Sequence, residues 1–231
     1  VARVISISQV TLDRFNTWAR YDRDRGVVVP NAVDLAQYGA GPKSPELVKK
    51  YRLEGRTVIM TFGRMVGKDR AKGFDEILQL LPELASRIDN VTYMAVGDGP
   101  DRKRLEHRAA ELGVAERVVF TGRIDDEIKA DIFRLADLYV MPSRGEGFGF
   151  VVLEAMACGV PVVASVQDGT REAVLDGKLG LLVDPDDPVS IRDGIVKGLN
   201  RPRGVPLGLE HFSRENFAQR LRSSLTSFCN M

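Results

Sequence analysis

The sequence predicts an α/β protein with a Rossmann-like, doubly wound parallel sheet. Its short apolar runs are continuous and do not alternate with polar residues, which is typical of strands buried on both faces. A glycine-containing turn and an amphipathic helix follow most of these runs, which indicates repeated βαβ units. With 231 residues, 44% of them hydrophobic, the chain is long enough to bury a core without disulfide or metal support.

Eight runs are expected to form strands. Most consist of β-branched and other apolar residues, and each is bounded by glycine, proline or charged residues. The expected strands cover residues 3–8, 26–29, 57–62, 91–96, 117–120, 138–141, 161–164 and 180–183.

Helix boundaries follow from capping residues. Ser44-Pro45 combines an N-cap serine with a proline at the first helical position. Residues 74–87 carry one apolar face, and Pro82 is predicted to kink or split that helix. Gly113 is a suitable end for a helix over 101–112, and Ser213 caps a last helix that runs to about residue 228. The other helices are expected over residues 126–136, 151–157, 170–175 and 189–199.

Composition excludes several classes of protein. Lys plus Arg is 33 and Asp plus Glu is 32, so the basic excess that gives nucleic-acid-coating proteins their affinity is absent. The two cysteines form no CxxC or Cys/His pair, so neither a disulfide framework nor a zinc site is expected. No signal peptide opens the chain, and no apolar run approaches the ~20 residues of a membrane span. We expect a cytoplasmic protein.

Glycines and charges gather where the predicted strands end. In open α/β sheets, ligands bind beyond the carboxyl ends of the strands. The strand exits carry Gly63-Arg64, Gly97-Asp98-Gly99 and the run 142–149. Glycine lets backbone N–H groups approach an anion, and the following helix N-termini add positive potential. We therefore expect a site for an anionic ligand, although βα turns also need glycine for purely structural reasons.

Two pairs of charged residues stand out at this edge. Arg64 and Lys72 would suit a diphosphate, with arginine as a fork and lysine as a point charge, but they also fit surface charges. Glu146 lies in the glycine-rich run, and Glu154 lies within the apolar helix. Because a carboxylate is rarely buried without a partner, Glu154 either meets ligand hydroxyls or marks an exposed stripe.

Residues 144–165 read RGEGFGFVVLEAMACGVPVVAS. This segment resembles the signature of the retaining GT-B glycosyltransferases of family 4, including their E-x7-E motif at Glu146 and Glu154. Gly63-Arg64 with Lys72-Gly73 is similar to the G-R…K-G motif of the family. Residues 29–34 (VPNAVD), 96–100 (VGDGP) and 119–122 (VFTG) also match, so the resemblance covers about residues 28–195.

The resemblance implies a donor-binding domain that uses a nucleotide-diphosphate sugar as substrate, with a GDP-sugar favoured, and needs neither metal nor cofactor. Arg64 and Lys72 would stabilise the leaving diphosphate, and Glu146 would contact the donor sugar. Glu154 would bind the ribose, and the backbone of residues 148–150 would support sugar and phosphate. The implied catalytic residues are Arg64, Lys72 and Glu146, and the implied donor-binding residues are Gly63, Gly97, Ile124, Asp126, Lys129, Phe148, Gly149, Phe150 and Glu154.

The same resemblance implies a domain division. Residues 1–25 would be a remnant of an N-terminal acceptor domain, 26–200 the nucleotide-sugar domain, and 201–231 a linker and helix. The chain begins at Val1 rather than Met, so we expect a piece of a longer enzyme that transfers poorly or not at all by itself. A glycan or lipid-linked sugar would be the acceptor. The absent half would carry any peripheral association with the inner face of a membrane.

The sequence departs from the family pattern in two places, and two alternatives stay open. Ala32 replaces the usual glycine, and the loop between Arg64 and Lys72, including Lys68, Asp69 and Arg70, is longer than the commonest form. A non-hydrolysing nucleotide-sugar epimerase is one alternative, against which the E-x7-E spacing and the Arg64/Lys72 pair argue. The other is a non-catalytic nucleotide-binding module, against which the two intact glutamates argue.

Overall fold

The computed structural model describes residues 4–67 and 72–229, so Lys68, Asp69 and Arg70 lie outside the described residues. Six parallel strands form the main sheet, in the order β5-β4-β3-β6-β7-β8. The direction of winding reverses between β3 and β6, which is the topological switch point of a Rossmann sheet. The predicted fold class is confirmed. The strands are β3 (Thr57–Phe62), β4 (Val91–Val96), β5 (Val118–Phe120), β6 (Leu138–Met141), β7 (Val162–Ser165) and β8 (Leu181–Val183).

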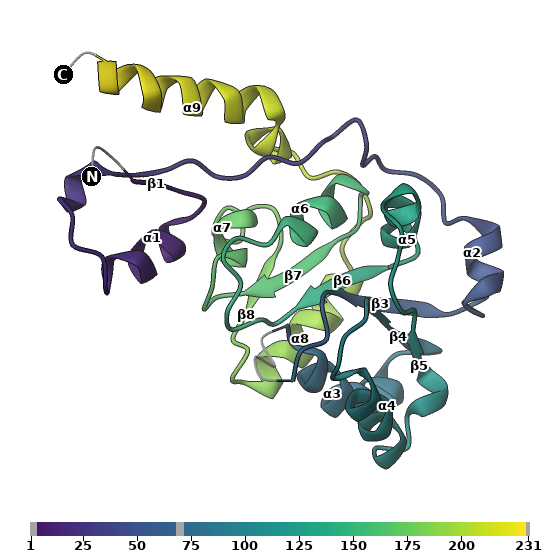
Figure 1. The fold of residues 1–231 in the computed structure, drawn as a ribbon. Coiled ribbons are helices and arrows are strands. Elements are labelled where there is room, and N and C mark those ends of the chain that lie inside the picture. The colour runs from purple at the N-terminus through teal and green to yellow at the C-terminus, as the bar shows by residue number, and fades with distance from the viewer. Residues whose placement is uncertain (1–3, 68–71, 230–231) are drawn as a thin grey trace.

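Helices cover both faces of the sheet, as Figure 1 shows. One face packs on α3 (Phe74–Arg87), α4 (Arg102–Glu111) and α8 (Pro188–Leu199), with one hydrophobic cluster between. A second cluster packs the other face. The helices of that face are α2 (Pro45–Lys50), α5 (Lys129–Arg134), α6 (Phe150–Ala157) and α7 (Thr170–Ala173).

The register of the central strands opens the sheet at its switch point. All six residues of β3 pair with β4, ending at Phe62 opposite Val96. On its other side β3 pairs with β6 only through Ile59–Leu138 and Met60–Tyr139. Because the β3–β6 ladder ends early, the segments that follow the two strands are free to diverge around a ligand.

The predicted helix caps are confirmed, and the predicted split of one helix at Pro82 is wrong. The Ser44 side chain accepts a hydrogen bond from the Leu47 N–H, and Ser213 accepts one from the Asn216 N–H. Helix α3 is not split at Pro82 but continues to Arg87. A proline inside a helix costs about 3 kcal/mol, whereas the buried apolar face of α3 contributes roughly 1.5–3 kcal/mol for each large side chain. Burial of several such side chains therefore outweighs the proline.

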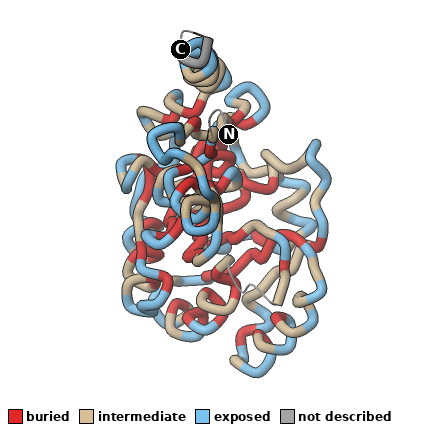
Figure 2. Tube along the Cα trace, turned by 60° about the vertical axis from the view of Figure 1, so that its left-hand side comes forward, coloured by how far each residue is buried: buried red, intermediate tan, exposed pale blue. Residues whose placement is uncertain are grey.

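Two peripheral segments flank this domain in Figure 1. At the N-terminal end, β1 (Val4–Ser6) leads into α1 (Gln9–Asn16) and pairs in parallel with β2 (Gly26–Val28). At the other end, α9 (Arg214–Cys229) follows the short helix η4 (Leu209–Phe212). Burial is concentrated in the sheet and the inner helix faces (Figure 2), and Trp18 near α1 is 73% exposed. The core therefore lies in the six-stranded domain.

Candidate active site

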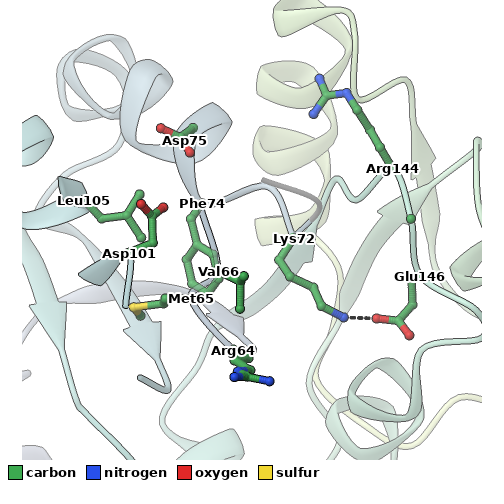
Figure 3. Close-up of a pocket in the computed structure, with 11 residues that line it drawn as sticks. Arg64, Met65, Val66, Lys72, Phe74, Asp75, Asp101, Leu105, Arg144 and Glu146 are labelled. Atoms are coloured by element: carbon green, nitrogen blue, oxygen red, sulfur yellow. Dashed lines mark hydrogen bonds and ion pairs between the residues drawn. The ribbon is translucent and has the colours of Figure 1, made fainter. Parts of the chain in front are cut away.

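A pocket of about 510 Å³ lies at the carboxyl ends of the strands, at the switch point. Arg64 lies two residues after the end of β3, Lys72 lies two residues before α3, and Glu146 lies in the loop after β6. All three line the pocket, so the structure brings the three predicted catalytic residues together (Figure 3). The other lining residues are Met65, Val66, Phe74, Asp75, Asp101, Leu105, Arg144 and Gly145.

Lys72 and Glu146 face each other across this pocket. The Lys72 ammonium donates to the Glu146 carboxylate, and Figure 3 draws this ion pair between the two sides of the crevice. Their side chains are 30% and 20% exposed. A Cβ added at Gly63 would lie 3.4 Å from the Lys72 side chain, an ordinary van der Waals contact, so the lysine packs alongside the end of β3.

Gly97 supports the strand exit rather than lining the pocket. Its φ is +117°, in the region that favours glycine, and an added Cβ would collide with the Gly63 carbonyl oxygen. The Gly63 N–H donates to the Val96 carbonyl at 3.0 Å. The two glycines therefore let the ends of β3 and β4 approach, and this contact places Arg64 at the mouth of the crevice.

Asp168 holds the backbone of the Glu146 loop. It is fully buried, and one of its carboxylate oxygens accepts from the Glu146 N–H at 2.9 Å. The other oxygen accepts from the Thr170 N–H at 3.0 Å and from the Thr170 hydroxyl at 2.7 Å. The predicted site residues did not include Asp168, although Asp168-Gly169 follows a predicted strand at the same edge of the sheet. Its spacing to Thr170 is typical of an Asx turn.

Glu154 lies on α6, outside the residues that line this pocket, and is 9% exposed. One carboxylate oxygen accepts from the Tyr38 hydroxyl at 2.9 Å and from the Lys129 ammonium at 2.8 Å. The other oxygen is buried without a hydrogen-bond partner among the described residues. The alternative of an exposed stripe is therefore wrong, because Glu154 is a buried carboxylate with remaining acceptor capacity.

Tyr38 was not predicted, because it lies 116 residues from Glu154 in the segment between β2 and α2. Burial, and then the charge and hydrogen bond of Glu154, raise the pKa of its phenol. The hydroxyl therefore stays protonated and donates to the carboxylate. Lys129 was predicted, and its partner is now defined as Glu154.

Both lysine–glutamate pairs lie against the end of β3. The Lys129 ammonium, bonded to Glu154, lies 5.3 Å from the centre of the Phe62 ring. The Lys72 side chain, bonded to Glu146, lies beside the next residue, Gly63, at van der Waals distance from where a Cβ would stand. Each glutamate is therefore connected through a lysine to the same strand end.

The remaining predicted donor-binding residues lie in the segments after β5 and β6 and at the start of α6. Ile124 packs against the hydrophobic core, and Asp126 is exposed at the start of η3 (Asp126–Ile128). Phe148 is buried against Phe212, with ring centres 5.7 Å apart. Gly149 has a φ of +96° at the N-cap of α6, and Phe150 is 50% exposed. Their contacts with a donor remain predictions.

The family model described as "Glycosyl transferases group 1" matches residues 56–201. The chain belongs to the group 1 glycosyltransferases. The matched segment contains the whole six-stranded sheet and both glutamates. The resemblance seen in the sequence is confirmed, and the epimerase alternative is not favoured.

Among curated relatives, the chain is 36% identical over 207 residues to a GDP-mannose-dependent alpha-(1-6)-phosphatidylinositol monomannoside mannosyltransferase of Mycolicibacterium smegmatis. That match covers 85% of this chain and 53% of the relative. A phosphatidyl-myo-inositol mannosyltransferase of the same organism is 41% identical over 174 residues, covering 75% of this chain and 42% of the relative. The chain thus spans about half the length of the curated relatives it matches.

Among solved structures, Anabaena Alr3699/HepE in complex with UDP and glucose superimposes with a TM-score of 0.83 and 26% identity. That match covers 98% of this chain and 64% of the other. Sucrose-phosphate synthase from Thermosynechococcus elongatus gives a TM-score of 0.79 with 25% identity, covering 98% of this chain and 58% of that one. The structural neighbours are GT-B glycosyltransferases, which confirms the predicted half of a GT-B fold.

Two further properties of the described residues bear on ligands and membranes. Within residues 4–67 and 72–229, no helix is long and apolar enough to cross a bilayer. The same residues contain no cluster of three or more histidine, cysteine or acidic side chains arranged to hold a metal ion.

Proposed function

We propose that this chain is the donor-binding half of a retaining hexosyltransferase, and that its donor is a GDP-sugar. The observation that carries the proposal is that two glutamates in different surroundings are each bonded to a lysine beside the end of β3. Glu146 lies in an open pocket beside two cations, and Glu154 is buried with one oxygen unpaired. A nucleotide sugar has matching groups in the same order: a sugar, a diphosphate and a ribose with two hydroxyls.

The open pocket suits the sugar and the diphosphate. As the bond between the anomeric carbon and the phosphate oxygen breaks, the leaving nucleoside diphosphate gains negative charge. Arg64 and Lys72 would stabilise that charge from fixed positions, which is an electrostatic contribution available without a metal. Glu146 would accept hydrogen bonds from the donor sugar. The N–H groups at the start of α6, at residues 148–150, would support the sugar and phosphate.

The buried glutamate suits the ribose. Two vicinal hydroxyls are natural donors to a carboxylate that already has one oxygen satisfied by Tyr38 and Lys129. Ile124, Asp126 and Lys129 would border the base. The mycobacterial relatives are named as GDP-mannose-dependent or as mannosyltransferases, which supports a GDP-sugar for this chain.

The acceptor would be a glycan or a lipid-linked sugar bound by a second Rossmann-like domain. The relatives whose printed names include phosphatidylinositol support a lipid-linked acceptor. We propose that the second domain carries any peripheral membrane contact at the cytoplasmic face, and that the 231-residue chain alone binds donor without transferring the sugar efficiently.

Titration calorimetry of the chain with GDP, UDP and ADP tests the proposal. We expect GDP to bind most tightly and the Glu154→Gln variant to lose at least tenfold in affinity, equivalent to about 1.4 kcal/mol. Glu116→Gln, which changes an exposed glutamate outside the crevice, is the matched control and is expected to bind GDP as the unmodified chain does. Binding of none of the three nucleotides would refute a donor site in this chain.

Retention is tested separately on a protein that includes an acceptor domain. The anomeric configuration of the product, measured by NMR from an α-linked donor, would be α for a retaining enzyme. A β product would overturn retention while leaving the donor site in place.

A further inference from the structure

The N-terminal end of α1 lies directly against the loop that carries Glu146. The Ser8 hydroxyl is 2.6 Å from the Gly147 carbonyl oxygen, and the Thr11 hydroxyl is 3.1 Å from the same oxygen. Ser8 is fully buried. The two hydroxyl oxygens also lie 2.8 Å apart, so the carbonyl next to Glu146 is part of one hydrogen-bonded cluster with two hydroxyls that lie more than 130 residues earlier in the chain.

The opposite side of the Gly147 peptide is equally confined. A Cβ added at Gly169 would collide with the Gly147 carbonyl oxygen, and one added at Gly147 would lie 3.3 Å from the Thr11 hydroxyl. The Gly169 N–H donates to the Glu146 carbonyl at 3.0 Å. The peptide is therefore held between α1 and the turn after β7, with no room for a side chain at Gly169 and only a tight fit for one at Gly147.

Two further contacts fix α1 in this position. The Glu172 carboxylate of α7 accepts from the backbone N–H groups of Gln9 and Val10, at 2.8 and 3.0 Å. These are N–H groups at the start of α1, which lack partners within the helix and attract a negative charge. The Arg14 guanidinium donates to the Gly145 carbonyl at 3.2 Å. The residues on both sides of Glu146 are thus bonded to α1.

We infer that Ser8 and Thr11 are positioning residues for Glu146, holding its loop so that the carboxylate meets the donor sugar. The inference rests on the proposed function, because it assigns Glu146 to the sugar. Glu146 itself is bonded to Lys72 by its side chain and to Asp168 by its N–H, so α1 supplies the restraint on the Gly145 and Gly147 carbonyls. The segment that precedes the donor domain in sequence thereby controls the sugar end of the crevice and leaves the nucleoside end unchanged.

The test compares a nucleotide with its sugar conjugate. Calorimetric titration of the 231-residue chain with GDP and with GDP-mannose gives a dissociation constant for each. For Thr11→Val, which keeps the side-chain shape and removes the hydroxyl, we expect GDP affinity within twofold of the unmodified chain and GDP-mannose affinity about fivefold lower. The Ser8→Ala/Thr11→Val double variant is expected to lower GDP-mannose affinity at least tenfold.

Two variants separate positioning from general damage. Thr11→Ser keeps a hydroxyl and is expected to restore GDP-mannose affinity. Thr17→Val is the matched control, because the Thr17 hydroxyl bonds within its own helix end, to the Arg14 carbonyl. The double variant also removes the serine N-cap of α1, so its melting temperature is measured in parallel, and Thr11→Val decides the outcome if the double variant does not fold.

Each result has a distinct meaning. Selective loss of GDP-mannose binding in Thr11→Val, with rescue by serine, supports the inference. If the unmodified chain binds both ligands and Thr11→Val binds both equally well, the inference is overturned and the proposed function stands. Equal loss of GDP and GDP-mannose also overturns it, since the contact would then serve the whole site. If the unmodified chain binds neither ligand, the proposed function fails and the inference falls with it.

Discussion

The end of β3 is bordered by two lysine–glutamate pairs of the same chemistry in different surroundings. Lys72 and Glu146 join two loops and are 30% and 20% exposed, whereas Lys129 and Glu154 join two helices and are 17% and 12% exposed. The Glu154 carboxylate also accepts from a distant side chain, the Tyr38 hydroxyl, whereas the further partner of the Glu146 carboxylate is the N–H of its chain neighbour Gly147. The comparison indicates that the helix-borne pair is part of the fold, while the loop-borne pair is open to exchange its partners for those of a ligand.

The largest expected effect is a difference in the free energy of unfolding between variants of the two glutamates. Glu154→Ala leaves Lys129 partly buried without its carboxylate, and we expect a loss of about 3 kcal/mol in the free energy of unfolding. Glu146→Ala opens a more exposed pair, and we expect a loss of at most about 1 kcal/mol. Urea unfolding followed by circular dichroism measures both. Equal losses in the two variants would show that burial does not distinguish the pairs.

An intermediate effect concerns the affinity for GDP at the loop-borne pair, Lys72 and Glu146. Lys72→Ala removes a cation next to the proposed diphosphate, and we expect GDP to bind roughly tenfold more weakly, near the ~1.5 kcal/mol of a hydrogen bond to a charged group. Guanosine, which lacks the diphosphate, is expected to bind both forms alike. Lys103→Ala, an exposed lysine of α4, controls for net charge. A loss shared by guanosine would place Lys72 at the nucleoside instead.

The smallest effect concerns Tyr38, which hydrogen-bonds to Glu154 of the helix-borne pair. Tyr38→Phe removes one hydrogen bond to Glu154 and keeps the ring, so we expect a loss of about 1 kcal/mol at neutral pH. Burial and the Glu154 charge raise the pKa of Tyr38 above the unfolded value of 10.0. A group with a raised pKa stabilises the fold below that unfolded value, and this stability is lost as the pH rises through the folded pKa.

The free energy of unfolding of the wild-type chain is therefore expected to fall more steeply than that of Tyr38→Phe as the pH rises above about 10. Chemical unfolding at pH 8, 9, 10 and 11 measures the difference between the two chains. Tyr93 and Tyr139, whose phenols burial also holds protonated, are present in both chains and cancel. Parallel curves would show that folding does not raise the pKa of the Tyr38 phenol.

The fold was predictable because its signals are local. Continuous apolar runs identified the strands of the sheet, and Ser44 and Ser213 marked helix starts. The split at Pro82 was wrongly predicted because the cost of a proline in a helix is visible locally. The burial that outweighs this cost depends on strands far away in the sequence, against which the apolar face of α3 packs. The spacing of Glu146 and Glu154 indicated one glutamate on a loop and one on a helix, and the structure places them there.

The partners of those glutamates were not predictable. Tyr38 reaches Glu154 across 116 residues, and Asp168 reaches Glu146 across 22. Neither contact leaves a periodic pattern, because it depends on how separate loops pack at the end of the sheet. Arg144 is a similar case: it lines the pocket, but Glu76 and Asp186 already engage its guanidinium.

The sequence by itself determined the α/β class, the edge of the sheet that carries the site, and the residue types that a nucleotide sugar requires. Periodicity, caps and motif spacing are properties of neighbouring residues and are readable without coordinates. Only the tertiary structure decided which glutamate is buried, which of its oxygens remains unpaired, and that α1 holds the loop of the other. Those features depend on burial and hydrogen bonding between segments that only folding brings together.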